Sequence, residues 1–360
     1  MKSIFLICAL VFASAVSEPI ISEKNLKVTS YNKKKQHRKA PKTVYIRSFK
    51  ALFEVYEEAS AKTMGSKKER ADRTTFISGT STRMGVQIQG VDVADFQSII
   101  DEAYINYVKE LTDQGFEVIT ADEAQKIDYY EGWEKIEGGA SSDDQAKGFV
   151  MVTPKGFNYM VKRVSKSGRE KGTFLEQGPK ISKELENVYL ADVNFIFPFV
   201  TLDANSSNWT NSSSVKAKIG YRMEPFMNTG QANEQGNSIA SIAKSFGASG
   251  NSSMLESQVR FLSGNDIGGS PFFDSNVTLK KAVYFEGVFK DKKIKEVTNA
   301  QVEMFEKTAY STLVMVSGDE KTVASHYADC NRENYVNAAS TSIQEMMNAG
   351  ISNFAEMTKD

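Results

Sequence analysis

The stretch "YVKELTDQGFEVITADEAQKI", residues 107 to 127, decides the fold class because it holds a helix end, a strand and a second helix start. Gly115 can take the left-handed backbone conformation that ends a helix. "FEVIT" then forms a short strand, and Thr120 with Glu123 three residues later makes a capping-box pattern that opens the next helix. Helix–strand–helix order is typical of an α/β layer. Helix starts and stops explain the whole stretch without any catalytic demand.

Two long amphipathic helices are expected on either side of a strand-rich centre. The first covers "DVADFQSIIDEAYINYVKELTDQG", where Asp92 can cap the start and Asp95 adds a favourable negative charge in the first turn. Its apolar stripe has the 3.6-residue spacing of a helix and consists of Phe96, Ile99, Ile100, Ala103, Tyr104, Tyr107, Val108 and Leu111. The second helix begins near Arg332, and its stripe consists of Tyr335, Ala339, Ile343, Met346, Met347, Gly350, Ile351 and Phe354.

Period-two alternation predicts strands in most of the remaining chain. Val44 and Ile46 open one such strand, and "TRMGVQIQGV" forms another. Further strand-like runs cover residues 149–164, 189–202, 215–223, 255–262, 276–289 and 309–318, and loops are expected at 61–81, 137–148, 205–213 and 227–254. The fold class is therefore α/β (or α+β), with a mixed β-sheet packed by the long helix of the N-terminal third and the C-terminal helix.

The N-terminus has the pattern of a secretory signal peptide: Lys2, then "IFLICALVFA", then a small-x-small cleavage site ending at Ala15. A lipid anchor is not expected, because Ile7 stands where a small residue would have to precede Cys8. The predicted organisation is a signal peptide at 1–15, a basic polar leader at 16–41 and an α/β core at 42–200. A β-rich continuation of the same or a second domain follows at 201–330, and a C-terminal helix occupies 331–360.

The signal-peptide pattern predicts a periplasmic or secreted protein, no later segment is apolar enough for a transmembrane helix, and the charge balance predicts no nucleic-acid partner. The chain carries 44 basic and 45 acidic residues, so no global positive charge attracts a polyanion. The leader "SYNKKKQHRKAPK" is either a solvated segment or an arm that touches anionic envelope polymer or lipid head groups. After signal cleavage only Cys330 is left, so no intramolecular disulfide is expected.

Metal and nucleophile chemistry has little support. The chain has two histidines, His37 and His326, and His326 lies four residues before Cys330 in "HYADC". Asp329 could add a third metal ligand, but a structural zinc site needs four ligands. A Cys–His pair needs more than local spacing, and no Gly-x-Ser-x-Gly, Gly-x-Gly-x-x-Gly or P-loop pattern occurs. No cofactor is therefore predicted.

Oxygen-rich positions leave two further possibilities open. Asn265, Asp266, Asp274 and Asn276 stand in one Gly-rich stretch, without the regular spacing of a calcium loop. A glycoside hydrolase needs only two carboxylates, which the sequence cannot exclude, although the pair Asp143-Asp144 is expected in a solvated loop. No catalytic, cofactor-binding or metal-binding residue is assigned.

The order of a strand ("TVYIRSF"), a long helix ending in "YVKELTDQGFEVITADEA" and a helix leading into "ISKELENVYLADVNFIF" resembles the CsgG-like envelope proteins. That group includes the N-terminal domain of TolB and the Lpo-type periplasmic activators, which share an anticodon-binding-like α/β core. The resemblance covers roughly residues 42–127 and 179–200 and implies an exported, non-enzymatic binding or assembly module. The secretion members are lipoproteins that form oligomeric pores. Here the anchor cysteine and clear paired strands of about ten residues with one lipid-facing side are missing, so the pore function is not carried over.

The leading expectation is thus an exported module of the cell envelope that acts through protein or envelope-polymer contacts. The alternatives are an exported glycan hydrolase that uses two carboxylates and an oligomeric secretion-pore subunit. The sequence predicts neither the partner nor the oligomeric state of the protein.

Overall fold

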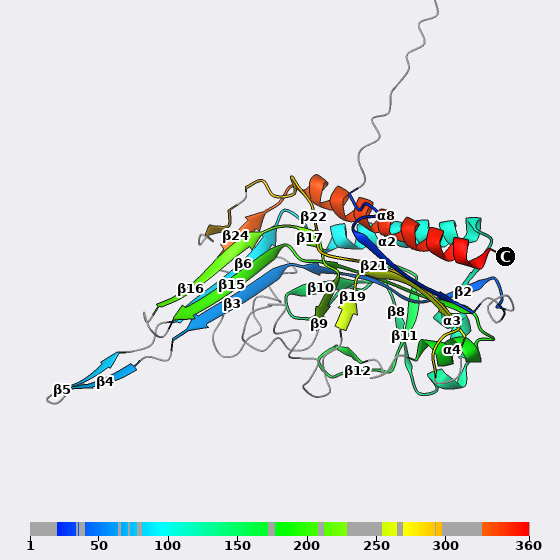
Figure 1. Cartoon of the computed structure of the whole chain (residues 1–360), viewed down its shortest axis with the longest axis horizontal. Coiled ribbons are helices and arrows are strands. Elements are labelled where there is room, and N and C mark those ends of the chain that lie inside the picture. Colours follow the sequence, from blue (N-terminus) through cyan, green and yellow to red (C-terminus); the bar gives the residue numbers. More distant parts are fainter. Residues whose placement is uncertain are drawn as a thin grey trace, which may run out of the picture.

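The computed structural model describes residues 20–33, 35, 40–63, 66–70, 73–77, 81–171, 177–207, 212–228, 254–264, 269–291, 293–296 and 326–359. The fold is mixed α+β: an eight-stranded sheet with helices on both faces, continued by a group of strands that projects from one end (Figure 1). The signal peptide, His37 and the predicted strand at 309–318 lie outside the described residues. None of the helices in the described part of the chain combines the length and the hydropathy needed to cross a membrane.

The central sheet has the strand order β1-β21-β20-β14-β2-β10-β9, and β7 also pairs with β2. Strands β2 and β14 run parallel, as do β2 and β7, whereas the other neighbours are antiparallel. The bounds are β1 (Leu26–Asn32), β2 (Thr43–Glu54), β7 (Glu117–Ile119), β9 (Ser142–Ala146), β10 (Phe149–Val152), β14 (Tyr189–Phe197), β20 (Gln258–Ser263) and β21 (Phe273–Leu279).

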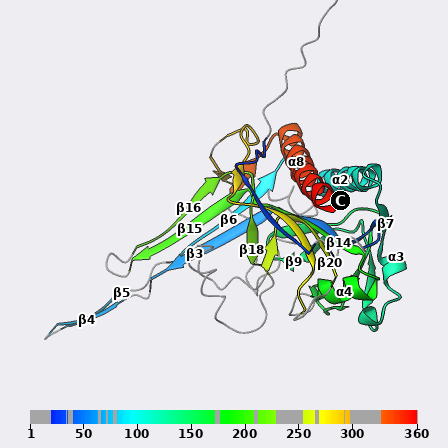
Figure 2. The ribbon, with the colours of Figure 1, turned by 45° about the vertical axis from the view of Figure 1, so that its right-hand side comes forward.

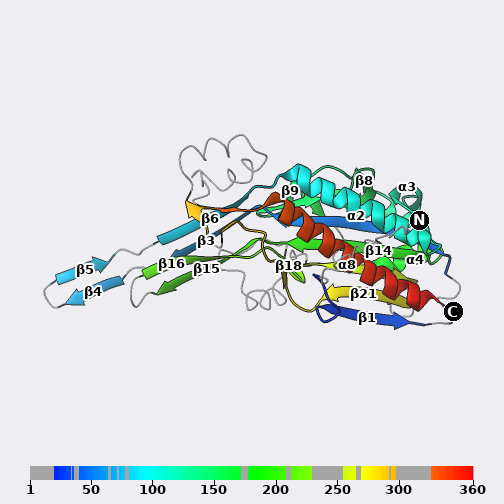
Figure 3. The ribbon, with the colours of Figure 1, turned by 90° about the horizontal axis from the view of Figure 1, so that it is seen from above.

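Two long helices, α2 (Val93–Asp113) and α8 (Arg332–Thr358), cover one face of the sheet (Figures 1 and 3). Their apolar stripes pack on this face of the sheet, where aromatic side chains of the helices and strands contact one another. The Phe53 ring stacks on Phe96 of α2 at 4.5 Å between centroids and on Phe197 at 5.2 Å. Phe354 of α8 stacks on Phe261 at 3.9 Å. Burial of these large apolar surfaces is the main source of stability.

Short elements cover part of the opposite face, called the second face below. They are α3 (Ala121–Ala124), α4 (Gly178–Glu184), the 3₁₀ turn η1 (Asp128–Tyr130), and the ladder of β8 (Glu134–Glu137) with β11 (Asn158–Val161). Their apolar contacts with the sheet involve Tyr45, Leu190 and Leu262, which alternate with the residues that face α2 and α8. Small ladders add β12 (Arg163–Val164) with β13 (Glu170–Lys171), β17 (Arg222–Met223) with β22 (Val283–Tyr284), and β18 (Phe226–Asn228) with β19 (Met254–Glu256).

Two β-hairpins project from the end of the sheet and form what we call the hairpin arm (Figures 1 and 2). The first hairpin joins β3 (Tyr56–Lys62) to β6 (Ser81–Gln89), with β4 (Ser66–Arg70) and β5 (Arg73–Ile77) as its tip. The second joins β15 (Val200–Ser207) to β16 (Ser212–Ile219). Strand β24 (His326–Asp329) adds to β6 in parallel, and β23 (Lys295–Glu296) pairs with β24.

The fold class and both long helices are confirmed. Asp92 caps α2 through a capping box with Asp95, the Thr120–Glu123 capping box is present, and Gly115 has a positive φ of 83°. All eight positions of the predicted C-terminal stripe are buried in α8.

Several predicted loops are wrong. Within 61–81 the chain forms β4 and β5, within 137–148 it forms β9, and residues 205–207 belong to β15. Residues 26–32 of the expected solvated leader are strand β1 of the central sheet, and Ile21 is buried beside it. Polar residues predominate in these strands, so no sustained apolar alternation marks them.

Candidate functional site

A β-bulge in β2 places two polar side chains on the second face of the sheet. The parallel pairing with β14 shifts register between Ala191 and Asp192, so that Ile46 faces Ala191 and Ser48 faces Asp192. Arg47 is the extra residue. A bulge of this kind redirects the strand so that two consecutive side chains share one face. The sequence of β2 contains a sign of this bulge. Its buried apolar residues on the face covered by α2 and α8 follow every second position except between Ile46 and Phe49, where the interval is three.

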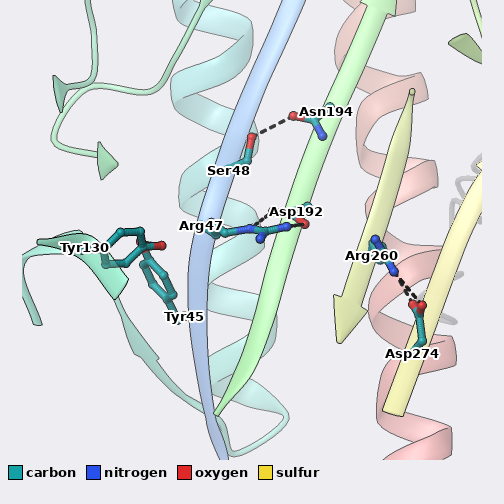
Figure 4. Close-up of polar contacts among 8 residues, drawn as sticks. All are labelled: Tyr45, Arg47, Ser48, Tyr130, Asp192, Asn194, Arg260 and Asp274. Carbon is teal, nitrogen blue, oxygen red and sulfur yellow. Dashed lines mark hydrogen bonds and ion pairs between the residues drawn. The ribbon is translucent and has the colours of Figure 1, made fainter. Parts of the chain in front are cut away.

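Arginine–aspartate pairs cross this face in a row that we call the polar stripe (Figure 4). Arg47 Nε donates to Asp192 Oδ1 at 2.9 Å, and a second guanidinium nitrogen contacts Oδ2. On the next two strands Arg260 Nε and Nη2 donate to the two oxygens of Asp274 at 3.0 and 2.7 Å. Asp192 and Arg260 are register partners, so the charges alternate in sign from β2 to β21.

The polar stripe has the geometry of a structural network. Both oxygens of each aspartate are engaged by a guanidinium in a bidentate pair, which is the strongest and most directional form of ion pair. Each carboxylate is therefore held by an arginine of a neighbouring strand, which favours a structural role for these aspartates. Ser48 Oγ adds a bond to Asn194 Oδ1 at 2.9 Å, and these contacts tie β2 to β14.

A pair of tyrosines continues the stripe at the end covered by η1. The hydroxyl groups of Tyr45 and Tyr130 lie 3.2 Å apart, and the two rings meet edge to face. Burial raises the pKa of Tyr45 well above its ordinary value and raises the pKa of Tyr130 to about 12. Both phenols thus stay neutral at physiological pH.

The most perturbed carboxyl group lies at the root of the hairpin arm. Glu54 ends β2 and is buried, and its Oε2 accepts from the backbone N–H groups of Phe199 and Val200 at 2.7 and 3.2 Å. Burial raises its pKa well above the ordinary value, and a hydrogen bond and the nearby charge of Glu57 raise it further. This carboxyl group bridges β2 and the start of β15 at the place where the parallel pairing of β2 with β14 ends.

Arg222 completes the root of the arm from the other side. Its guanidinium donates to the Val200 and Gly220 carbonyl oxygens and, through Nε, to Glu224 at 2.6 Å. Ser257 accepts from the Ile196 N–H at 3.0 Å and donates to the Glu224 carbonyl oxygen at 2.5 Å. The root is therefore a closed hydrogen-bond network that fixes how both hairpins leave the core.

The two hairpins of the arm pack their apolar sides together and keep polar sides outward. The inner sides carry Ala59, Ala61, Met84, Val86, Val200, Leu202, Val215 and Ala217. Thr82 Oγ1 joins the two hairpins through bonds of 3.1 and 2.8 Å to the backbone and side-chain oxygens of Ser213. The outer side of β15–β16 pairs Asp203 with Lys216 and Thr201 with Lys218. Clear paired strands with one apolar side, which the sequence did not reveal, are therefore present.

The structure does not bring His326, Asp329 and Cys330, the candidate metal ligands and nucleophile, into one site. "HYAD" is a strand and not a helix, so His326 and Cys330 are separated by four strand residues, about 13 Å. Asp329 lies on the opposite side of that strand from His326 and forms an ion pair with Lys290 at 2.9 Å. The Cys330 thiol is buried, and burial raises its pKa to about 12, so it is a poor nucleophile at neutral pH.

The structure describes only some of the oxygen-rich candidates. Asp274 and Asn276 belong to β21, and Asn265 and Asp266 fall outside the described residues. Asp143 and Asp144 lie in strand β9 and not in a loop. Among the residues that the structure describes, no group of three or more His, Cys, Asp or Glu side chains could hold a metal ion.

Comparison of the chain with protein-family models, with curated proteins and with solved structures gave no match. The polar stripe and the arm were not predictable as sites from sequence spacing. Arg47 and Asp192 are 145 positions apart, and only the central sheet brings them together.

Proposed function

We propose that this chain is an exported, non-enzymatic assembly module of the cell envelope that binds a protein partner through the hairpin arm. The observation that carries the proposal is the arm itself. It is anchored at a buried network and extends away from the core (Figure 2). The outer side of β15–β16 carries the exposed residues Asp203 and Lys216. Recognition surfaces are commonly held on extensions from a rigid scaffold in this way.

The charges of the arm favour a protein over an anionic polymer. Asp203 stands opposite Lys216 on the outer side of β15–β16, and Glu58 on the outer side of β3 is paired with Arg83 and Lys147. At these positions charges of opposite sign lie side by side, which disfavours attraction of a polyanion to this part of the arm. The expected resemblance to CsgG-like envelope proteins is compatible with this proposal.

Site-specific photo-crosslinking in the producing cell tests the proposal. A photoreactive residue is placed at Thr201 or Asp203 on the outer side of β15, and a matched one at Ile105, which is 66% exposed on α2. We expect discrete crosslinked protein species from the arm positions and none from Ile105. Hydrolysis of a glycan by the purified chain that is lost in Asp192→Asn or Asp274→Asn would overturn the proposal in favour of the hydrolase.

The two hairpins also favour a second candidate, the oligomeric secretion-pore subunit. Each hairpin has one apolar side, and those sides could face lipid only if the hairpins separated. A Thr82→Cys, Ser213→Cys pair locks them together at the point where their side-chain oxygens lie 2.8 Å apart. Ring-sized particles that form in the wild type and disappear in the oxidised, locked variant would support the pore. A monomer or dimer by light scattering in both would eliminate it.

A further inference from the structure

Within the part of the chain that the structure describes, no strand pairs with the outer edge of β1 in the central sheet. Strand β1 pairs with β21 in an unbroken register from Leu26↔Leu279 to Asn32↔Phe273, and it is the outermost strand on its side of the molecule (Figure 3). The Lys33 N–H donates to the Phe272 carbonyl oxygen, and the Lys280 N–H donates to the Asn25 carbonyl oxygen. Since antiparallel bonding alternates, the odd-numbered residues bond to β21, and Leu26, Val28, Ser30 and Asn32 direct their backbone N–H and C=O groups outward.

The two edges of the sheet differ in how they are protected. At the opposite edge, β9 is short, its register with β10 is interrupted, and it carries the consecutive charges Asp143 and Asp144. These are features by which proteins prevent edge-to-edge pairing. Strand β1 has neither a bulge nor a proline, and its single charge is Lys27. Val28 and Tyr31 are large side chains left 52% and 47% exposed on it.

We propose that β1 is a self-association edge, at which it pairs antiparallel with β1 of a second copy of this chain about a twofold axis. The pairing would join the two central sheets into one, with Thr29 on the axis. A twofold interface must be self-complementary, because the same surface serves both partners. Addition of a strand to an open edge supplies backbone hydrogen bonds as the main source of affinity.

The sequence of β1 fits this register and disfavours its neighbours. Pairing Leu26 with the partner's Asn32 is the register that uses all seven strand residues, and it sets the outward-directed groups of Val28 against those of the partner's Ser30. Lys27 then lies opposite the partner's Tyr31. A shift of two residues in one direction would place Lys27 against the partner's Lys33, a like-charge contact that destabilises a sheet. A shift in the other direction leaves Tyr31 and Asn32 without strand partners.

Cysteine crosslinking of the exported, processed protein tests the proposal independently of the arm. In the proposed register Thr29→Cys meets its own symmetry mate at a non-hydrogen-bonded pair, where side chains are closest. Mild oxidation should convert most of this variant to a disulfide dimer. Val28→Cys, the adjacent residue, faces the partner's Ser30 and should give at least tenfold less. The wild type is the control for Cys330, which is 1% exposed.

A proline variant adds a test that needs no new thiol. Ser30→Pro removes one outward N–H while leaving the bonds to β21 in place, so the fold should be retained and the dimer lost in sedimentation. A dimer that persists in Ser30→Pro, or Thr29→Cys that crosslinks no better than Val28→Cys, would overturn the proposal. Failure of the arm to crosslink a protein partner would leave these results unaffected, so the two proposals are tested separately.

Discussion

Glu54 and Phe199 are joined across the point where the core becomes the arm: the Phe199 N–H donates to Glu54 Oε2 at 2.7 Å. Strands β2 and β14 are hydrogen-bonded neighbours up to the pair Phe53 and Phe197 and then separate into different hairpins. The buried carboxyl group occupies the site of the missing strand partner. It satisfies backbone donors that burial would otherwise leave unpaired, at a cost of about 1–3 kcal/mol each.

The raised pKa of Glu54 predicts that the protein is less stable at higher pH. A carboxyl group whose pKa is raised by folding stabilises the folded state fully below its unfolded pKa, about 4.3. That contribution is lost as the pH rises through the raised pKa. We expect Glu54→Gln, which keeps an acceptor for Phe199 and Val200, to remove this part of the pH dependence.

Urea unfolding at pH 5 and pH 8 measures the effect. The free energy of unfolding of the wild type should fall between the two pH values relative to that of Glu54→Gln. Glu117→Gln, at an exposed position on β7, is the matched control and should follow the wild type. Equal pH slopes for Glu54→Gln and the wild type would contradict the prediction.

Asp95 connects the starts of the two long helices, and its loss should cost more than the loss of the N-cap. Its carboxylate accepts from the Asp92 N–H at 3.0 Å and from Arg332 Nε at 2.7 Å, and the residue is 5% exposed. Asp92→Ala should lower stability by about 1 kcal/mol, as for other N-caps. Asp95→Ala removes the other half of the capping box, which is the bond accepted from the Asp92 N–H, and also the contact with Arg332 of α8.

Thermal and urea unfolding of three variants separates these contributions. We expect destabilisation in the order Asp95→Ala, then Asp92→Ala, then Arg332→Ala. The arginine side chain is 67% exposed, and an exposed ion pair contributes at most about 1 kcal/mol. A larger effect for Arg332→Ala than for Asp95→Ala would show that the ion pair and not the capping box matters.

Gly350 allows α8 to lie directly on β20. A Cβ atom at this position would be 2.4 Å from Val259 Cγ1 and 2.6 Å from its Cβ, closer than carbon atoms approach. Gly350→Ala should therefore destabilise the protein by about 1–3 kcal/mol, as overpacking does, although alanine favours a helix by about 1 kcal/mol. Urea unfolding measures the change, and Ser352→Ala at an exposed position of the same helix is the control. A Gly350→Ala variant that is more stable than the wild type would contradict the close packing.

The long helices were predictable because their information is local. The stripe of α8 from Tyr335 to Phe354 and the capping residues of α2 stand within one helix each. Strand β1 was not predictable in this way, because only one of its seven side chains is buried. Its conformation is imposed by pairing with β21, about 250 residues away in the chain. The hairpin β4–β5 and the strand β9 were not predicted either, because strands composed mainly of polar residues resemble loops in sequence.

The polar stripe shows the same limit at the level of single residues. The break in period between Ile46 and Phe49 signalled that β2 carries an irregularity. It did not identify Asp192 as the partner of Arg47, since that depends on which strand lies beside β2. Composition, which gives only the total of charged residues, could not distinguish carboxylates held by arginine from carboxylates available to a substrate.

A double-mutant cycle on Arg47 and Asp192 tests whether the stripe stabilises the sheet. The aspartate side chain is 7% exposed and the arginine side chain 21%, so removal of one partner leaves the other charge poorly solvated. We expect Asp192→Ala to cost about 3 kcal/mol and the double variant with Arg47→Ala to cost less than the sum of the two single changes. Urea unfolding of the four proteins gives the coupling energy, and the same cycle on the exposed pair Lys109 and Asp113 of α2 is the control. A coupling energy for Arg47 and Asp192 no larger than that of the exposed pair would contradict a stabilising role of this ion pair.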